Sequence, residues 1–432
     1  MVHGLSDRSD VVFDDERVVV NAGIVLAVTL GRRLGIEALV DATVRLGRRP
    51  GACRPGRKVL SLIHAMLLGA DSIDDCDVLR PGRTAAVLSH RPMAPSTLGT
   101  FLRSFSFGHV RQLDRVLAQA LGRAWRAGAG PGADRLVVDI DSFIGEVHGH
   151  AKQGAGYGYT KRLGYHPILA TRSDTGEVLH VRLRKGQANT QRGALRFVEE
   201  LLARVRRAGA AGQILLRADS GFWSMKVIAR LREQGCRYSI GVRMHRSVSE
   251  RIAQIPDEDF EPVPDYPDSG VCELAETTLG AERLIVRRVH LHAQDDQTEL
   301  FAYWRHHAFI TNRSEAMHEV DREHRAHAQV ELVIRELKDQ ALGHFPSGHF
   351  SANSAWTVIA CLAHNLGRWT DVLGLCDPTP RAARTLRRRL LALPGRLTKT
   401  ARRWTLHLPA RWPWQTASVE ALTRIRALTA PA

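Results

Sequence analysis

The spacing of apolar residues divides the chain into a helical first part and a mixed second part. Apolar positions recur at helical intervals over residues 24–34, 59–68 and 113–125. This periodicity predicts an all-helical unit over residues 1–130. A stretch rich in Gly and Pro over residues 127–133 predicts a linker at its end.

Beyond that linker the pattern changes to short apolar runs separated by turns. Runs at residues 136–141, 165–170, 178–183 and 214–218 predict strands, and helical spacing returns over residues 192–207 and 225–233. Strands followed by alternating helix and strand are typical of a mixed α/β domain. We expect its first part over residues 131–235.

The α/β pattern is interrupted before it resumes. Strand-like runs at residues 238–242, 283–289 and 300–304 predict a β-rich insertion over residues 236–310. Helices are then expected at about 314–342 and 354–373, which complete the domain over residues 311–375. A basic tail over residues 376–432 follows, in which the arginines form either a solvated helix face or phosphate contacts.

Charge narrows the possible partners. The chain has 432 residues, 61 Lys+Arg against 45 Asp+Glu, a net charge of +16 and a pI of about 10.3. A surplus of this size favours a polyanion, either nucleic acid or an acidic membrane surface. In a chain of this charge we interpret the helical N-terminal unit as a DNA-binding domain.

Cysteine usage and the N-terminus predict a cytoplasmic protein. The six cysteines are scattered without a Cys-x-x-Cys pair, so neither a disulfide framework nor structural zinc is expected. Acidic residues precede the first apolar stretch, which is atypical of a signal peptide. The apolar stretch over residues 18–30 is too short to span a bilayer, so we expect no membrane partner.

Carboxylates stand where two predicted buried strands end. Asp141 closes the first run and Asp219 follows the last, while Asp139 lies two residues before Asp141 and shares its face of the strand. Such carboxylates are costly unless a positive charge lies between them, and divalent metals are the usual occupants. Either Asp139 or Asp141 could hold metal, and the alternative is that both face water.

The predicted late helix carries a polar stripe. At about 100° per residue, His324, His327, Glu331 and Lys338 fall within a stripe about 60° wide. Glu331 borders an apolar stripe and is expected to be half-buried, whereas Glu336 lies about 140° away and is expected to face solvent. The alternatives are a solvated charged face, or zinc or iron bound by the two histidines and Glu331.

These motifs together resemble a known family. Asp141-Ser-Phe143, the Gly-rich residues 149–154 and 164–167, and the Arg217–Phe222 segment look like the group 1 DDE transposase domain of bacterial insertion sequences of the "thirteen-eighty" family. The late helix resembles the Tyr-x2-Arg-x3-Glu-x6-Lys signature of that superfamily, with histidine in place of both Tyr and Arg.

The resemblance implies a fold and a set of site residues. The fold would be an RNase H-like catalytic domain interrupted by a β-rich insertion, with the helical DNA-binding domain before it. Asp141, Asp219 and Glu331 would be the catalytic triad, holding two Mg²⁺ ions with Mn²⁺ as a substitute, and Asp139 remains a further candidate ligand. Asp141 is preferred because Ser142 follows it. The candidate DNA contacts are Lys338, His327, His324, Lys161, Arg162 and Arg217.

The function implied is that of a DNA transposase. It would bind the inverted-repeat ends of an element as a homodimer, cleave them by two-metal phosphodiester hydrolysis, and join the 3′-hydroxyl ends to target DNA. A bacterial, nucleoid-associated location follows from the resemblance. Two alternatives remain: an RNase H-like nuclease without strand transfer, and a transposase-derived DNA-binding protein that has lost catalysis.

Overall fold

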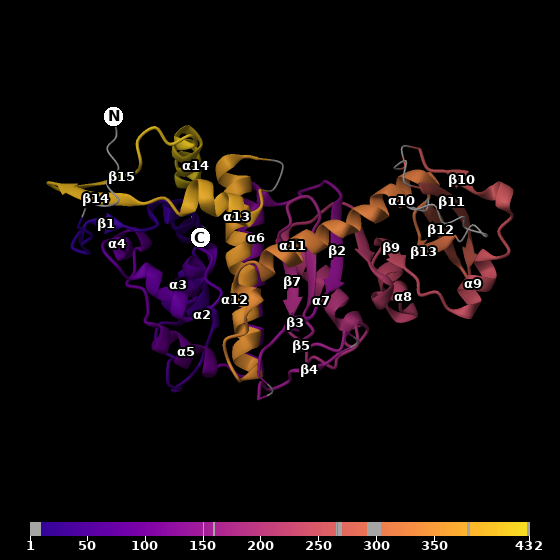
Figure 1. The fold of residues 1–432 in the computed structure, drawn as a ribbon, viewed down its shortest axis with the longest axis horizontal. Coiled ribbons are helices and arrows are strands. Elements are labelled where there is room, and N and C mark those ends of the chain that lie inside the picture. The colour runs from indigo at the N-terminus through magenta and orange to yellow at the C-terminus, as the bar shows by residue number, and fades with distance from the viewer. Residues whose placement is uncertain are drawn as a thin grey trace.

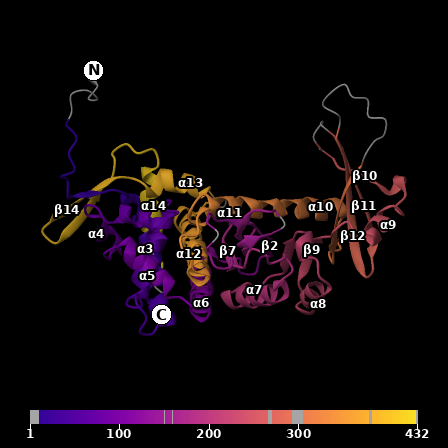
Figure 2. The same cartoon turned by 60° about the horizontal axis from the view of Figure 1, so that its bottom comes forward.

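The predicted segments follow one another along an elongated molecule. The computed structural model describes residues 10–149, 151–158, 160–264, 266, 270–291, 304–377 and 381–429. Helices of the N-terminal part lie at one end, a large mixed sheet fills the middle, and the strands of the predicted insertion lie at the other end (Figures 1 and 2).

The N-terminal end is built from helices, as the apolar spacing predicts. They are η1 (Ala22–Ile24), α1 (Val25–Arg33), α2 (Ile36–Thr43), α3 (Pro55–Leu67), η2 (Asp74–Leu79), α4 (Thr84–Leu88), α5 (Pro95–Arg103) and α6 (Phe107–Ala124). The predicted linker is packed instead of free. The turn η3 (Trp125–Ala129) continues α6, and Trp125 Nε1 donates to Glu177 Oε1 at 2.8 Å.

The first part of the α/β domain contributes five strands to the large sheet, and two of them, β2 and β8, lead to the predicted acids. The five strands are β2 (Leu136–Ser142), β6 (Ile168–Arg172), β7 (Val178–Arg182), β8 (Ile214–Ala218) and β9 (Arg237–Gly241). β2 pairs in parallel with β8 and antiparallel with β6, and β8 pairs in parallel with β9. A smaller sheet beyond the end of β2 contains β3 (Gly145–Glu146), β5 (Leu163–Tyr165) and β4 (Gly156–Tyr157).

The insertion extends the central sheet. The strand order is β10-β11-β12-β13-β9-β8-β2-β6-β7, in which β13 pairs antiparallel with β9. The first strand expected in the insertion, β9, therefore belongs to the central part. The expected strand at 300–304 lies outside the described residues except for Trp304. The insertion elements are α9 (Arg246–Ile252), η5 (Asp257–Asp259), β10 (Glu261–Pro262), β11 (Gly270–Leu279), β12 (Glu282–Leu291) and β13 (Arg305–Thr311).

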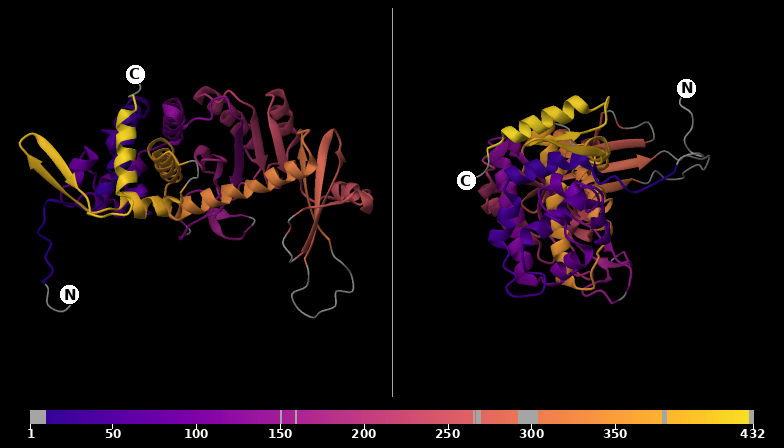
Figure 3. Two further views of the ribbon diagram at one scale, coloured as in Figure 1. Left: turned by 90° about the horizontal axis from the view of Figure 1, so that it is seen from above. Right: turned by 90° about the vertical axis from the view of Figure 1, so that its left-hand side faces the viewer.

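Helices cover the two faces of the sheet (Figure 3). α7 (Ala194–Ala208) and α8 (Met225–Glu233) lie on one face. The other face is crossed by α10 (Met317–Arg325), the tight turn η6 (Ala326–Ala328) and α11 (Gln329–Lys338). The single helix predicted over 314–342 is thus interrupted at η6, which shifts the helical phase between His324 and Glu331.

A buried helix joins the sheet to the N-terminal helices. α12 (Phe350–Trp369) follows η7 (Ala341–Gly343) and is buried from Ala352 to its end, where η8 (Thr370–Leu375) begins. Its Asn365 side chain donates to Val178 O at 2.8 Å and accepts from Val178 N at 2.7 Å. One apolar core runs from Ile24 to Ile425, so the N-terminal helices and the sheet share their interior.

The basic tail folds back onto the N-terminal helices. Its elements are α13 (Ala383–Leu386), η9 (Arg387–Leu391), β14 (Gly395–Thr400), β15 (Arg403–His407) and α14 (Gln415–Ala427). β14 pairs with β1 (Val18–Val19), and Arg387 Nε donates to Leu67 O at 3.2 Å. The tail is therefore not the single solvated helix face that was one of the two alternatives.

Two observations bear on the cellular expectations. Within the described ranges, none of the helices has the length and apolar character needed to cross a membrane. The six cysteines, all among the described residues, are free.

Candidate active site

Asp141 and Asp219 emerge from neighbouring parallel strands. Ile140 of β2 is in register with Ala218 of β8, so the two acids follow at equivalent positions. Parallel strands lie about 4.8 Å apart, and their carboxyl ends meet at one edge. Asp219 also begins the turn η4 (Ser220–Phe222), where its Oδ1 accepts from Gly221 N at 3.1 Å.

The third predicted acid faces the same region from across a groove. Glu331 on α11 and Asp219 both line a groove of about 520 Å³, together with His324 and His327. Glu331 is exposed, not half-buried as predicted, and its carboxylate makes no hydrogen bond or ion pair with the residues that the structure describes. Its side chain is therefore free to move within the groove.

Neither strand-end acid is paired with a cation closely enough to cancel the effect of its burial. The pKa of Asp141 is raised to about 6, chiefly by burial and also by the negative charges of Asp219 and Glu331, against the opposing effects of Ser142 N–H and His327. Burial also raises the pKa of Asp219, which His327 and Arg243 partly offset. A cation placed among these carboxylates would relieve this repulsion.

Asp139 is neutralised within the protein. Arg217 Nε lies 2.7 Å from Asp139 Oδ1, and Arg217 Nη2 lies 2.8 Å from Oδ2. The pair is buried and in register across β2 and β8. Since both carboxylate oxygens accept from Arg217, Asp139 is a poor candidate for a metal ligand, and Asp141 remains the stronger choice.

The same contacts overturn the predicted role of Arg217. It is about 1% exposed, and its guanidinium also donates to Ser173 Oγ at 2.7 Å and to the carbonyls of Glu323 and Ala326. A guanidinium enclosed in this way cannot reach DNA. Arg217 instead joins the sheet to the junction between α10 and η6, because it binds carbonyls at a helix C-terminus.

The two histidines of the stripe differ in environment. His327 Nδ1 lies 3.0 Å from Asp139 Oδ1 and its ring is only partly buried. His324 stacks on Phe309 with ring centroids 4.0 Å apart, and its Nδ1 lies 2.7 Å from Ser239 Oγ. Burial lowers the pKa of His324 to about 3, with help from the charge of His327. His324 is thus a neutral packing residue in place of the charged DNA contact expected.

The predicted lysine and its basic neighbours gather beyond the end of β2. Lys338 Nζ lies 5.1 Å from the Phe143 ring centroid, and its pKa is lowered by burial. Arg162 pairs with Glu146 at 2.6 Å on the small sheet, while Lys161 is exposed in a left-handed conformation with φ of 56°. These residues lie beside Asp141 in the fold, on the side away from the insertion.

Glu336 does not face solvent as predicted. Its carboxylate is ion-paired with the buried Arg368 of α12, and burial raises its pKa. The helix-wheel argument placed Glu336 away from Glu331 correctly, but α12 covers that side of α11. The prediction failed because sequence periodicity does not show which helix faces are covered by distant segments.

Sequence reasoning missed the wall of the groove that the insertion supplies. Arg287, His306 and His307 come from β12 and β13 and line it together with Arg325, and both arginines are ion-paired with Asp321, which lines the groove as well. Burial lowers the pKa of both histidines. The extension of the sheet by the insertion brings these residues to the groove, and nothing in their local sequence marks them.

The donor set fits a hard divalent cation, although the acids are not drawn together on one ion. In the part of the chain that the structure describes, no three Asp, Glu, His or Cys side chains are close enough to hold a metal. This holds both for Asp141, Asp219 and Glu331 and for His324, His327 and Glu331. Three carboxylates on separate elements, one of them free to move, suit Mg²⁺ or Mn²⁺.

Comparison with known proteins identifies the family of this chain. A search of curated proteins finds no match. Among solved structures, the piggyBac transposase in its synaptic complex with hairpin DNA is similar with a TM-score of 0.48 and 12% identity, covering 87% of this chain and 80% of that chain. A family profile described as transposase DDE domain group 1 matches residues 5–430. Since that match spans nearly the whole sequence, the chain belongs to the group 1 transposase DDE domain family.

Proposed function

We propose that this protein is a DNA transposase whose active site consists of Asp141, Asp219 and Glu331. It binds the inverted-repeat ends of an insertion sequence, cleaves them by metal-dependent phosphodiester hydrolysis, and joins the 3′-hydroxyl ends to target DNA. The observation that carries the proposal is geometric. Asp141 and Asp219 follow register-matched residues at the ends of neighbouring parallel strands, and Glu331 lines the same groove as Asp219, although the three lie far apart in sequence.

Asp141, Asp219 and Glu331 would hold Mg²⁺, with Mn²⁺ as a substitute. Two such ions supply an activated nucleophilic oxygen and stabilise the leaving 3′-oxygen. The role of the protein is to position the carboxylates. Arg217 and Asp139 join the strands to the end of α10 and to η6, which precede the helix that carries Glu331, and His327 of η6 also contacts Asp139.

Basic residues on both sides of the acids would hold the DNA backbone. Lys338, Lys161 and Arg162 lie beyond β2, and Arg287 and Arg325 lie across the groove. His327 also lines this groove and is a further candidate for contact with the backbone. Arginine and lysine suit phosphate because they donate several hydrogen bonds and carry a positive charge.

The finer fold assignment is part of this proposal. An RNase H-like catalytic domain over 131–235 and 311–375, interrupted by the 236–310 insertion, is supported by the mixed order β7-β6-β2-β8-β9. The parallel neighbours in this order carry Asp141 and Asp219 at one edge. We further propose that residues 1–130 contribute DNA binding, and that a homodimer pairs the two element ends.

The test is cleavage of the DNA that flanks this reading frame. Purified full-length protein and Mg²⁺ are mixed with labelled duplex carrying those flanks. We expect cleavage and joined products from the wild type, and a rate at least about 100-fold lower from Asp219→Asn or Glu331→Gln. Both variants should still bind the duplex.

The outcomes separate the remaining functions. A variant that cleaves at the wild-type rate would contradict the assignment of that acid. Cleavage without any joined product would favour a nuclease. A wild type that binds the flanks and never cleaves, in Mg²⁺ or Mn²⁺, would favour a DNA-binding protein that has lost catalysis.

A further inference from the structure

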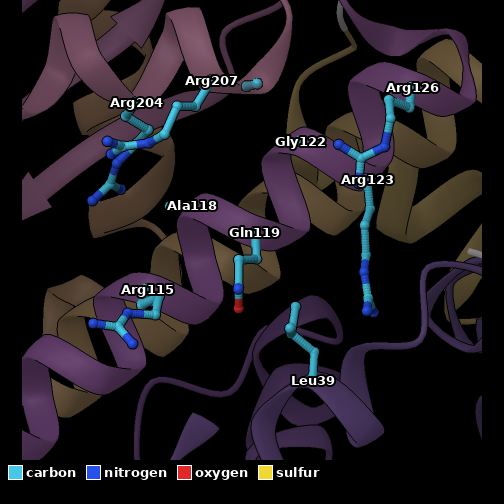
Figure 4. Close-up of a pocket in the computed structure, with 10 residues that line it drawn as sticks. Leu39, Arg115, Ala118, Gln119, Gly122, Arg123, Arg126, Arg204 and Arg207 are labelled. Atoms are coloured by element: carbon cyan, nitrogen blue, oxygen red, sulfur yellow. The ribbon is translucent and has the colours of Figure 1, made fainter. Parts of the chain in front are cut away.

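A second groove lies away from the acids, between α6, α2 and the end of α7. Its volume is about 790 Å³, and it shares no lining residue with the groove around Asp219. Arginines from α6 and α7 project along it (Figure 4). No Asp or Glu is among the ten residues that line it, and five of the ten are arginines.

Two of these arginines already have partners. Arg204 Nη2 donates to Asp114 Oδ1 at 2.7 Å, and the residue is buried. Arg123 Nη1 donates to Leu34 O at 2.8 Å and to Gly35 O at 3.1 Å, which joins α6 to the turn before α2. These two residues therefore build the walls of the groove.

The other three are available for a ligand. Arg115, Arg126 and Arg207 are exposed, and none makes a hydrogen bond or ion pair with any residue that the structure describes. The pKa of Arg123 is lowered by burial and then by the charge of Arg126, so the positive charges repel one another across this surface. A bound polyanion would relieve that repulsion.

The close approach of α6 and α7 fixes the spacing of the arginines. A methyl group at Gly122 would make ordinary van der Waals contacts, 3.5 Å from Arg126 Nη1 and 3.7 Å from Ala208 Cα, so α6 and the end of α7 lie close together here. Arg115 on α6 and Arg126 on η3, which continues α6, are about three helical turns apart, roughly 16 Å at 1.5 Å per residue.

We propose that this arginine groove binds the phosphate backbone of duplex DNA at a site separate from the active site. The inference rests on the proposed function, since it assigns a second DNA surface to a transposase. An elongated groove with unpaired arginines from two helices suits a linear polyanion. Phosphate contacts of this kind hold and orient DNA and do not read its sequence.

The test compares two triple variants of the full-length protein that lose the same charge. The first is Arg115→Gln, Arg126→Gln and Arg207→Gln. The control is Arg80→Gln, Arg246→Gln and Arg424→Gln, three surface arginines that are already paired with acids. Binding of a labelled duplex is measured by fluorescence anisotropy in EDTA at several salt concentrations, and metal-dependent cleavage is measured in parallel.

We expect the groove variant to bind about tenfold more weakly than the control and to reduce the salt slope by about two to three. A third protein with lysine at the same three positions should restore most of the slope, because it retains the charge. Thermal unfolding checks that all three proteins are folded.

Equal affinity and salt slope for the groove variant and the control would overturn the groove assignment. If the wild type still cleaves in that case, the proposed function stands without the groove. A wild type with no affinity for any duplex would overturn both proposals. Loss of binding in the glutamine variant without rescue by lysine would also overturn the groove, because it would point to a structural role.

Discussion

At the residue scale, the most informative feature is the difference between Asp139 and Asp141. Both lie on β2 and point to the same face, as the two-residue period of a strand predicts. Arg217 neutralises Asp139 completely, whereas Asp141 faces Asp219 and Glu331. Asp139 thus stabilises the fold, whereas Asp141 remains available for chemistry.

The raised pKa of Asp141 predicts a pH-dependent cost to stability. Its pKa is about 6 in the folded protein and about 3.9 in an unfolded chain. Between these values the folded state binds more protons, so the contribution of Asp141 to stability is present below pH 4 and is lost as the pH rises through 6. Asp141→Asn should therefore stabilise the metal-free protein by about 1–3 kcal/mol at pH 7 and by little at pH 4.

Denaturant unfolding at the two pH values measures this difference. Saturating Mg²⁺ should reduce the stability that Asp141→Asn gains at pH 7, because the cation stabilises the wild-type carboxylate. The same gain at both pH values would contradict the electrostatic explanation. Loss of stability at pH 7 would do so as well.

At the element scale, Arg217 joins the sheet to the junction of α10 and η6, which precedes the helix that carries Glu331. Removing it leaves the Asp139 carboxylate buried, with the His327 ring as its remaining side-chain partner among these contacts. Arg217→Gln should cost about 3–5 kcal/mol of unfolding free energy, because one partner of a buried pair is left uncompensated. Denaturant unfolding followed by circular dichroism measures it.

Arg135 supplies the matched control for that experiment. It pairs with Glu323 of α10 at the surface, and 43% of its side chain is exposed. Arg135→Gln should cost less than about 1 kcal/mol. Similar costs for the two variants would show that burial of the Arg217 pair does not determine its contribution.

Elements with strong local patterns could be predicted from the sequence. The N-terminal helices, β2, β8 and the region of α10 and α11 follow from apolar spacing alone. That α12 and the N-terminal helices share one core could not be predicted, because this depends on contacts between segments far apart in the chain. The turn η6 was missed for a related reason, because a short change of helical phase leaves no periodic signal.

The residues of the candidate site also divide into those that could be predicted from the sequence and those that could not. Asp141, Asp219 and Glu331 are marked by their positions on predicted elements, and the fold brings them around one region. The burial of Arg217, His324 and Glu336 depends on partners up to 109 residues away, so each was misplaced by sequence reasoning. Ion pairs formed across the fold leave no local pattern.

At the scale of the whole molecule, positive charge is distributed over several surfaces. The net charge of +16 was interpreted as a sign of a polyanionic partner. Basic residues line the groove around the acids, the arginine groove on α6 and α7, and the β14–β15 hairpin. A molecule with several basic surfaces can contact more than one segment of DNA, which agrees with the proposed function.

The central claim is that three acids from distant segments act as one metal site, and direct metal binding tests it best. Metal-free full-length protein is titrated with Mn²⁺, and free ion is followed by electron paramagnetic resonance. The matched control is Asp339→Asn, an exposed acid one residue after α11. We predict that Asp141→Asn, Asp219→Asn and Glu331→Gln each weaken Mn²⁺ binding by at least about tenfold, while the control binds as the wild type does. Unchanged Mn²⁺ affinity in all three variants would contradict the account.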